Sequence, residues 1–247
     1  MESRFFLERS NLGDVRALDL LVQEVTKKFG NLAALNKCSL KVSSDAIYGL
    51  IGPNGSGKTT LFNIITGFLS PDSGEIVYSG KSITRHSPAS IARLGLVRTF
   101  QLSRIFSNLS VCENLEAARQ RKTDEKRINE LLNLVQLYDF RDVPAGKLSY
   151  GQKKQLELAR ALILDPSILL LDEPTSGLEP NLIKIMIEQI RYARKLGKGV
   201  FIIEHNMNVI TNLAERIFVL HNGAKIAEGS PGEIRADKQV IDAYLGE

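Results

Sequence analysis

The sequence contains few cysteines and no long apolar run. Its two cysteines, Cys38 and Cys112, match no metal-ligand spacing and are too few for a disulfide scaffold. We therefore expect reduced thiols in a reducing compartment and assign them no function. No run of about 18 apolar residues is present, and charged residues interrupt the segment 1–19, so neither a spanning helix nor a signal peptide is expected. These absences predict a cytoplasmic chain.

The sequence also lacks a strong excess of one charge, with 32 lysines and arginines against 28 acidic residues. The basic residues are scattered and mostly stand beside acids, as in 119–127, which is typical of a solvated helix face. We therefore expect no nucleic-acid partner. With 247 residues and 43% hydrophobic composition, the chain is near the upper size for one hydrophobic core, which predicts one domain with lobes.

The most informative segment is glycine-rich and precedes a predicted helix. It has the spacing of a phosphate-binding P-loop and reads Gly52-Pro53-Asn54-Gly55-Ser56-Gly57-Lys58-Thr59. The glycines let backbone N–H groups turn inward around an anion, while Lys58 reaches the terminal phosphates and Thr59 offers its hydroxyl to a metal. An apolar strand over 47–51 and a helix over 60–67, with a C-cap glycine, supply the context that the motif requires. The segment predicts a bound nucleoside triphosphate with Mg²⁺.

Two kinds of structure are predicted around this motif. Short β-rich stretches at 20–25, 39–42 and 75–78 indicate a small antiparallel layer wrapped around the P-loop strand. From Val111 onward the apolar residues recur at helical spacing, which predicts an all-helical insert at about 103–165.

The sequence also predicts where the helices of the insert begin. Ser110 with Glu113, and Ser149 with Gln152, form capping-box pairs that begin two of them. Thr123 opens another, whose apolar face consists of Ile128, Leu131, Leu132 and Val135.

After the insert, apolar strands alternate with helices. Strands are predicted at 168–171 and 200–203, and the helix between them has an apolar face made of Ile183, Met186, Ile187 and Ile190. Such strands indicate a parallel sheet buried on both faces. The stretches 216–220 and 224–227 predict a hairpin at the sheet edge. The expected fold class is therefore α/β, with a P-loop NTPase core, a mostly parallel sheet, an antiparallel β layer and an inserted helical subdomain.

Polar residues follow three predicted strands, at the edge where an open parallel sheet binds its ligands. After four apolar residues, Asp172 is placed to hold Mg²⁺ through water, and Glu173 to polarise a water against the γ-phosphate. Gln101 follows the strand 96–100 and is able to bind metal or water, although such a residue is also typical of an ordinary loop. His205 follows another strand, where an imidazole either hydrogen-bonds the γ-phosphate or serves the structure alone.

A second anion site is predicted on the helical insert. Ser149-Tyr150-Gly151-Gln152 places a hydroxyl and a glycine N–H at a helix N-terminus. The helix dipole and unsatisfied donors there attract negative charge, each contact contributing about 0.3 to 2 kcal/mol. A well-capped helix without a ligand explains the same residues equally well.

These motifs, in this order, resemble those of the ATP-binding subunits of ABC transporters. The shared features are the P-loop, Gln101, Leu148-Ser149-Tyr150-Gly151-Gln152, the Walker B strand with Glu173, and His205. The resemblance covers residues 20–247 as one ATP-binding domain, and residues 1–19 form an extension of unknown role. It implies an ATPase that couples ATP hydrolysis to transport at the cytoplasmic face of the inner membrane.

By this resemblance, one group of residues holds ATP and Mg²⁺ within the chain. It consists of Phe29 stacked on adenine, Gly52 to Thr60 on the phosphates, Thr59, Gln101 and Asp172 at the metal, Glu173 as general base and His205 as γ-phosphate sensor.

A second group acts on ATP held by a facing subunit, and consists of Ser149, Gly151 and Gln152. Hydrolysis then needs two ATP-binding subunits head to tail, as an ATP-dependent homodimer or heterodimer. Transmembrane permease subunits are the other implied partners. Their cytoplasmic helix would enter the groove between the lobes, where the candidate contacts, unless they pack inward, are Leu102, Ile105 and Phe106.

Within the family, the chain is most similar to the ATPases of branched-chain amino acid importers. The similarity rests on 66–68, 97–101, Tyr150 in the signature and the ending 243–247. Relatives usually have glycine in place of Tyr150, and Ser-Ala-Leu-Asp where Ser176-Gly177-Leu178-Glu179 stands here, which leaves the trans-subunit contacts of this loop open.

Other classes of protein are compared with this chain by the sequence features that are typical of each class. A GTPase would need an Asn-Lys-x-Asp guanine reader, but the only Asn-Lys pair, Asn36-Lys37, is followed by Cys38. An exporter ATPase for lipopolysaccharide or lipid, or a urea importer ATPase, would have a similar cassette. A soluble ABC ATPase acting on DNA or ribosomes commonly has two cassettes or a long coiled-coil insertion, and this chain has neither.

Overall fold

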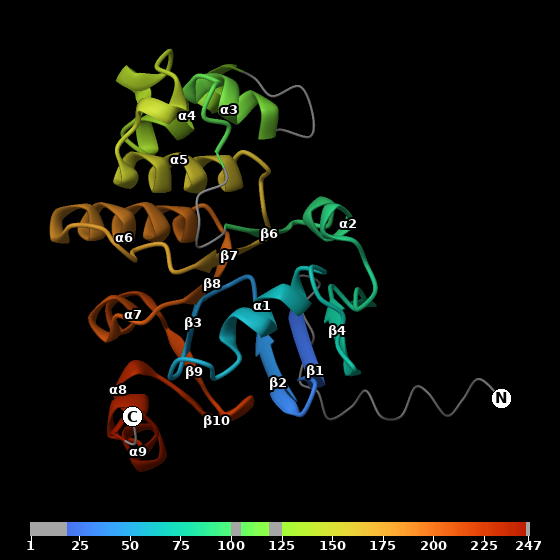
Figure 1. Cartoon of the computed structure of the whole chain (residues 1–247). Coiled ribbons are helices and arrows are strands. Elements are labelled where there is room, and N and C mark those ends of the chain that lie inside the picture. The colour runs from blue at the N-terminus through green and yellow to red at the C-terminus, as the bar shows by residue number, and fades with distance from the viewer. Residues whose placement is uncertain (1–18, 100–104, 119–124, 246–247) are drawn as a thin grey trace.

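The computed structural model describes residues 19–99, 105–118 and 125–245, and these form two sheets with helices around them (Figure 1). Within them, the central sheet has six strands in the order β10-β9-β3-β8-β7-β6. These strands are β3 (Ile47–Ile51), β6 (Leu96–Arg98), β7 (Ile168–Asp172), β8 (Gly199–Ile203), β9 (Arg216–His221) and β10 (Ala224–Gly229). The second sheet has the order β2-β1-β4-β5, with β1 (Leu20–Phe29), β2 (Leu32–Val42), β4 (Ser73–Tyr78) and β5 (Lys81–Ser82).

The central sheet is parallel except for the β9–β10 hairpin. Every residue of β3, β7 and β8 is buried, because helices cover one face and the antiparallel layer covers the other. Asn222 and Gly223 both have positive φ, as the tight turn of a right-twisted hairpin requires. The predicted parallel sheet and edge hairpin are confirmed.

The antiparallel layer encloses α1 (Lys58–Ile65) against the central sheet. The Phe62 ring of α1 is fully buried and lies 5.0 Å from the ring of Phe201 on β8. The helix begins at Lys58, two residues earlier than predicted, because Gly57, in a left-handed conformation, ends the loop there. It ends before Gly67, whose φ of 73° matches the predicted C-cap position.

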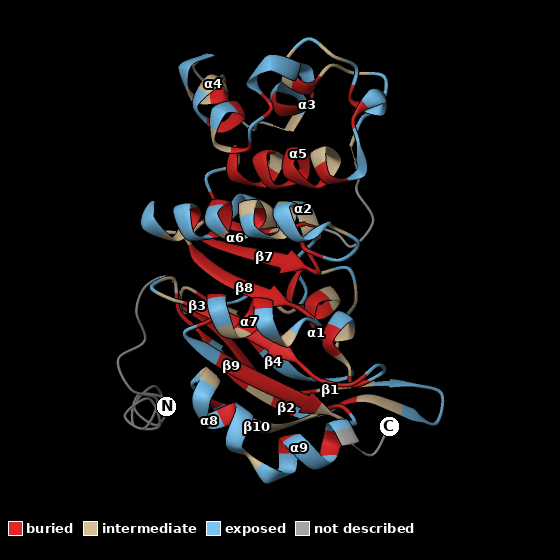
Figure 2. Ribbon diagram, turned by 90° about the vertical axis from the view of Figure 1, so that its left-hand side faces the viewer, coloured by how far each residue is buried: buried red, intermediate tan, exposed pale blue. Residues whose placement is uncertain are grey.

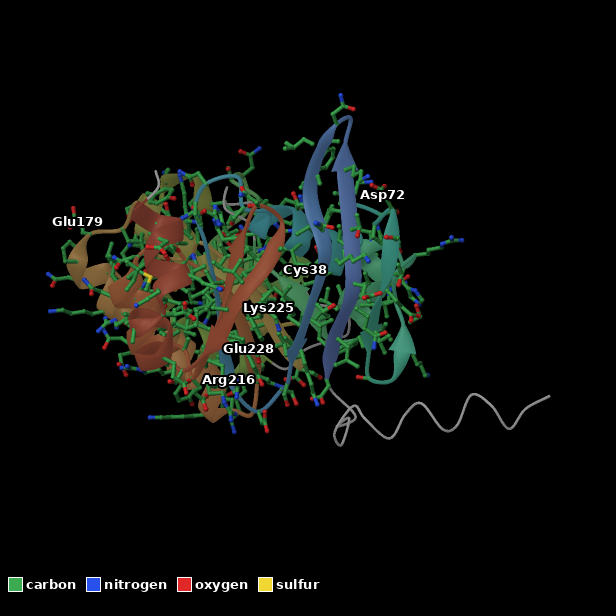
Figure 3. All side chains as sticks on the ribbon, turned by 90° about the horizontal axis from the view of Figure 1, so that it is seen from below. Cys38, Asp72, Glu179, Arg216, Lys225 and Glu228 are labelled. Carbon is green, nitrogen blue, oxygen red and sulfur yellow. The ribbon has the colours of Figure 1, made fainter. Side chains whose placement is uncertain are left out.

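The two sheets meet where β2 passes β10. The backbone N–H of Asn36 donates to the carbonyl of Gly223 at 2.9 Å, and Cys38 and Lys225 lie on the two neighbouring strands (Figure 3). Burial raises the pKa of the Cys38 thiol to about 11, so this thiol is protonated at neutral pH.

The helical lobe consists of α3 (Val111–Ala118), α4 (Glu125–Leu134), two short 3₁₀ turns and α5 (Tyr150–Leu162), with α5 between the other helices and the central sheet (Figure 2). Both predicted capping boxes are present, at Ser110 and at Ser149. The predicted apolar face of α4 is buried, whereas Thr123 lies outside the described residues. One continuous apolar cluster joins this lobe to the sheet through Leu131, Leu156, Ile190 and Val200.

The remaining helices are α2 (Pro88–Arg93), α6 (Pro180–Lys195), α7 (Met207–Leu213), α8 (Pro231–Ala236) and α9 (Lys238–Leu245). On α6 the buried stripe includes Met186 and Ile190 as predicted, but Ile183 and Ile187 are only half-buried. Gln189 and Ala193 complete the stripe instead, because they face the core one turn further along. None of the helices in the described part of the chain is long and apolar enough to span a bilayer.

Candidate nucleotide-binding site

The P-loop follows β3 and is closed by glycines that no other residue can replace without displacement. A Cβ at Gly52 would lie 2.1 Å from the carbonyl oxygen of Leu220, and a Cβ at Gly57 would lie 2.4 Å from that of Ala34. At Gly55, by contrast, nothing lies within 4 Å of the Cβ position. The loop is therefore held tightly on its inner side and is open on its outer side.

Lys58 lies inside this arch although its side chain carries a charge. The residue is 6% exposed, and its ammonium donates to the carbonyls of Gly52 at 2.7 Å and Pro53 at 2.8 Å. Carbonyl oxygens offset only part of the cost of burying a cation. An anionic group brought to the loop would therefore find a desolvated positive charge.

A hollow of about 310 Å³ opens over the loop, and we call it the P-loop hollow. It is lined by Phe29, Leu32, Ala34, Asn54, Gly55, Ser56, Gly57, Lys58, Thr59, Thr60, Glu173 and His205. The chain thus brings together segments from β1, β2, the P-loop and the ends of β7 and β8.

The rim of the hollow is apolar. Phe29 is 51% exposed, and Leu32, its partner in the β1–β2 register, is 69% exposed. The sequence interpretation included Phe29 but missed Leu32, which lies opposite Phe29 across a tight turn, and Ala34, two residues further along β2. Two exposed apolar side chains beside a phosphate loop suit a flat, largely apolar ligand group.

Glu173 and His205 meet at the opposite wall. The Nε2 of His205 lies 2.5 Å from the Oε1 of Glu173, so the two side chains are within hydrogen-bond distance of each other. Glu173 directly follows β7 in a left-handed conformation with φ of 50°, and its N–H donates to Ile203 of β8. This turn directs the carboxylate from the strand end into the hollow.

Asp172, one residue earlier, is not part of the lining. Its carboxylate accepts a 2.6 Å hydrogen bond from Arg98 at the end of β6, and both side chains are buried. Arg98 also donates to Asn63 on α1 at 2.7 Å, and its guanidinium lies 5.6 Å from the ring centroid of Phe62. The sequence interpretation gave Arg98 no role in the site, because its partner Asp172 is 74 residues away in sequence.

Glu204 is another buried carboxylate at this edge of the sheet. It accepts from the N–H of Thr175 at 3.0 Å and from the hydroxyl of Thr175 at 2.7 Å. Burial raises the pKa of Glu204, and these hydrogen bonds oppose the rise. Glu204 therefore ties the turn after Glu173 to the end of β8.

The residues 149–152, which we call the signature segment, lie apart from the P-loop hollow of the same chain. Ser149 caps α5 through Gln152, and the start of α5 rests on α6, where a Cβ at Gly151 would lie 2.5 Å from Leu182. Gln101 lies outside the described residues. The structure thus gathers most of the predicted ATP contacts into one hollow and leaves the signature segment elsewhere.

Comparison with known proteins identifies the family. Residues 35–176 match the family described as ABC transporter, and residues 224–247 match the one described as branched-chain amino acid ATP-binding cassette transporter. The chain belongs to the ABC transporter family. This ABC cassette is 39% identical to the high-affinity branched-chain amino acid transport ATP-binding protein BraF of Pseudomonas aeruginosa, over 92% of the chain and 98% of the relative.

Solved structures of ABC cassettes superpose on most of the chain. One, an ADP conformation of an ATP-binding cassette of an ABC transporter, has a TM-score of 0.83 and 32% identity, and covers 93% of this chain and 99% of its own. Another, a dimeric post-hydrolysis state bound to ADP and Pi, has a TM-score of 0.76 and 26% identity, and covers 86% and 98%. The chain is therefore an ATPase of the ABC type, and the predicted fold class is confirmed.

Proposed function

We propose that this ABC cassette hydrolyses ATP to drive the uptake of branched-chain amino acids. The observation that carries the proposal is the Glu173–His205 pair, 2.5 Å apart, on the wall of the hollow above the P-loop. The substrate class rests on the transport function for which relatives such as BraF are named and on the match of residues 224–247. Exporters, urea importers and soluble ABC ATPases are less favoured, since the matched relatives are named for branched-chain amino acid transport.

The predicted ATP-binding and catalytic residues have separate roles in this proposal. The adenine lies on Phe29, the phosphates lie on the loop from Gly52 to Thr60, and Lys58 neutralises the terminal phosphates. Glu173 takes the proton of the attacking water, because its carboxylate lies in the same hollow as the P-loop. His205 holds the γ-phosphate and, through its bond to Glu173, links the presence of that phosphate to the base.

The residues present fit Mg²⁺. Within the described ranges no cluster of three or more His, Cys, Asp or Glu side chains is able to form a metal cage. Mg²⁺ does not need one, because it is usually held by one or two carboxylates, phosphate oxygens and water. Thr59, which lines the hollow, would offer its hydroxyl to the ion, Asp172, which is paired with Arg98 outside the lining, would act through water, and Gln101 would be a third group. The ion would neutralise charge on the phosphates.

The signature segment is proposed to act on a second cassette. Ser149 is exposed and absent from the lining of its own P-loop hollow, so a facing subunit is needed to bring such a residue to ATP. The dimeric structure of a related cassette supports this arrangement. We infer an ATP-dependent dimer of two head-to-tail cassettes, either identical or paired with a homologous subunit.

Transmembrane permease subunits are the other proposed partners, and they would hold the cassette at the cytoplasmic face of the inner membrane. Phe106 is 49% exposed and its ring centroid lies 4.8 Å from the guanidinium of Arg160 on α5. The buried Asn114 fixes the Phe106 backbone through its N–H and its carbonyl, both at 2.9 Å. Ile105 instead packs partly against the core, and Leu102 lies outside the described residues.

The test is reconstitution with the membrane subunits that co-purify with the cassette. In vesicles containing the matching binding protein, leucine or valine should accelerate ATP hydrolysis and be taken up, whereas urea should do neither. The Glu173→Gln cassette sets the background of both measurements. If urea stimulates hydrolysis, or if no small molecule does, the cassette belongs instead to one of the less favoured systems.

A further inference from the structure

Tyr150, the first residue of α5, touches the loop that joins β7 to α6. Its hydroxyl donates to the carbonyl of Ser176 at 3.3 Å. Its ring lies over Gly177, where an added Cβ would be 3.1 Å from the ring atom Cε1 and 3.6 Å from Cζ. The Tyr150 side chain therefore bridges two segments 26 residues apart in sequence, even though the residue is 50% exposed.

Gly177 is matched to this ring in two ways. Its φ of 74° is a left-handed conformation that side chains rarely adopt, and the ring of Tyr150 occupies the space beside it that a Cβ would enter. A large residue at position 150 and the absence of a side chain at position 177 are thus complementary. Residues 176–179, which we call the 176–179 loop, include this glycine.

A second contact lies beside the first. The backbone of Gly151 packs so closely on α6 that a Cβ there would lie 2.5 Å from Leu182 and 3.6 Å from Leu178. Leu178 belongs to the 176–179 loop, and its N–H donates to Thr175 at 3.2 Å. The start of α5 is therefore held by the ring of Tyr150 on one residue of the loop and by the Gly151 backbone on another.

The other end of the loop leads to the catalytic wall. The N–H of Ser176 donates to the carbonyl of Glu173 at 3.2 Å, and Thr175 is fixed by the buried Glu204. Glu179 follows at the outer edge of the molecule, on the side opposite Asp72, with no side-chain cap to α6 (Figure 3). A short path of contacts thus runs from Tyr150 through Ser176 to Glu173.

We propose that Tyr150 is a positioning residue for ATP hydrolysis, which fixes the signature segment to the 176–179 loop of the same subunit so that both move as one body. This inference rests on the proposed function, in which the signature segment binds ATP held by a second cassette. When the signature segment engages that ATP, the 176–179 loop is carried along and the turn that orients Glu173 is held in place. The contact between ring and glycine is the mechanical link.

The experiment measures ATP-driven dimerisation in the Glu173→Gln protein by sedimentation. Tyr150→Ala should raise the ATP concentration at half-dimerisation about tenfold, because a hydrogen bond and a ring contact are lost from the surface that engages ATP. ATP binding to the monomer, measured with a fluorescent ATP analogue at low protein concentration, should not change. Tyr192→Ala is the matched control, since this tyrosine on α6 is 46% exposed and lies outside the junction.

Two further variants separate a positioning role from a direct contact with the partner or its nucleotide. Tyr150→Phe keeps the ring on Gly177 and should recover most of the dimerisation, with the remaining deficit due to the bond to Ser176. Gly177→Ala should weaken dimerisation in the same direction, and combining it with Tyr150→Ala should add little, because both changes break one contact. Fully additive effects would mean that the two residues act separately, which would overturn the inference.

The outcomes also distinguish this inference from the proposed function beneath it. If the Glu173→Gln protein with Tyr150 intact does not dimerise in ATP, the trans arrangement itself is wrong. If that protein dimerises and Tyr150→Ala dimerises at the same ATP concentration, the trans arrangement stands and Tyr150 is not its positioning residue. In the assembled transporter with Glu173 restored, Tyr150→Ala should lower kcat about fivefold and leave KM for ATP within about twofold.

Discussion

The P-loop hollow and the signature segment are both predicted anion sites at the start of a helix, but the chain builds them to different degrees. The inner side of the P-loop packs closely on neighbouring backbone, because Gly52 and Gly57 lie against the carbonyl groups of Leu220 and Ala34. Lys58 is buried, with 6% of the residue exposed. The signature segment has an exposed Ser149 whose cap is formed only with Gln152, three residues away. One site is complete within the chain, and the other presents its donors outward.

This difference separates the residues proposed to bind and activate ATP from the residues proposed to engage a partner. Groups that bind and activate must be held before the ligand arrives, because reorganisation during the reaction costs rate. A surface that closes on a partner must remain accessible until the partner comes, and it gains its full contacts only in the complex. The contrast predicts that substitutions in the hollow affect ATP directly, whereas substitutions in the helical lobe affect what ATP does to partners.

The largest effect is expected from Glu173→Gln, which keeps the size of the side chain and removes the base. Turnover should fall roughly 10²- to 10⁴-fold while ATP binding is kept. Glu204→Gln is the matched control, because Glu204 is also a buried carboxylate after a strand but lies outside the hollow. Single-turnover hydrolysis of radiolabelled ATP measures both, and near-normal turnover of Glu173→Gln would assign the base to another residue.

The next largest effect is expected from Lys58→Ala. Removing the buried ammonium leaves the terminal phosphates without their cation, and the affinity for ATP should fall about 10³-fold. Lys184→Ala, which removes an exposed lysine of α6, should leave the affinity unchanged. Isothermal titration with Mg·ATP gives the comparison, and unaltered affinity of Lys58→Ala would contradict the assignment of the hollow to ATP.

The elements that were predicted correctly from the sequence are those determined by residues close together in the chain. The strand 47–51 is found as β3 with the predicted bounds, and the capping boxes at Ser110 and Ser149 follow from residues three positions apart. The sequence predicts that the helix after the P-loop starts at Thr60, but it begins at Lys58, because the left-handed Gly57 ends the loop and Lys58 and Thr59 belong to the first helical turn.

The parts that were missed depend on distant pairs. Arg98 and Asp172 are 74 residues apart in sequence, and Tyr150 and Ser176 are 26 apart, so no local pattern marks either contact. Only the folded sheet places the ends of β6 and β7 side by side. The same holds for the rim of the hollow, where Leu32 is an unremarkable hairpin residue until β1 and β2 bring it beside Phe29.

A smaller effect, confined to partners, is expected from Phe106→Ala. The isolated cassette should keep its ATPase activity within about threefold, because Phe106 lies outside the hollow, while stimulation by the membrane subunits should fall about tenfold. Phe140→Ala is the control, since this phenylalanine on the same lobe is 38% exposed. If partner binding and stimulation both survive Phe106→Ala, the docking surface lies elsewhere.

The smallest effect is expected from Glu204→Gln, which compares Glu204 with Glu173, the two carboxylates that follow the neighbouring strands β8 and β7. Burial raises the pKa of Glu204 above its ordinary value of 4.5, so the folded protein holds this proton more tightly than the unfolded chain. The stabilising contribution of the protonated form is therefore complete below pH 4.5 and is lost as the pH rises through the folded pKa. Glu204→Gln cannot ionise and still offers an oxygen to Thr175, so its stability relative to the parent should increase as the pH rises from 4.5 to 7.

We expect a gain on the order of 1 kcal/mol at pH 7 relative to pH 4.5, because the hydrogen bonds from Thr175 already offset part of the burial cost. Urea unfolding of both proteins at each pH measures the difference, and the ionisations that they share cancel in it. Parallel stability profiles would mean that Glu204 is solvated when ionised. The turn that carries Glu173 would then be held by backbone contacts alone, and the rigidity that distinguishes the P-loop hollow from the signature segment would not depend on a buried charge.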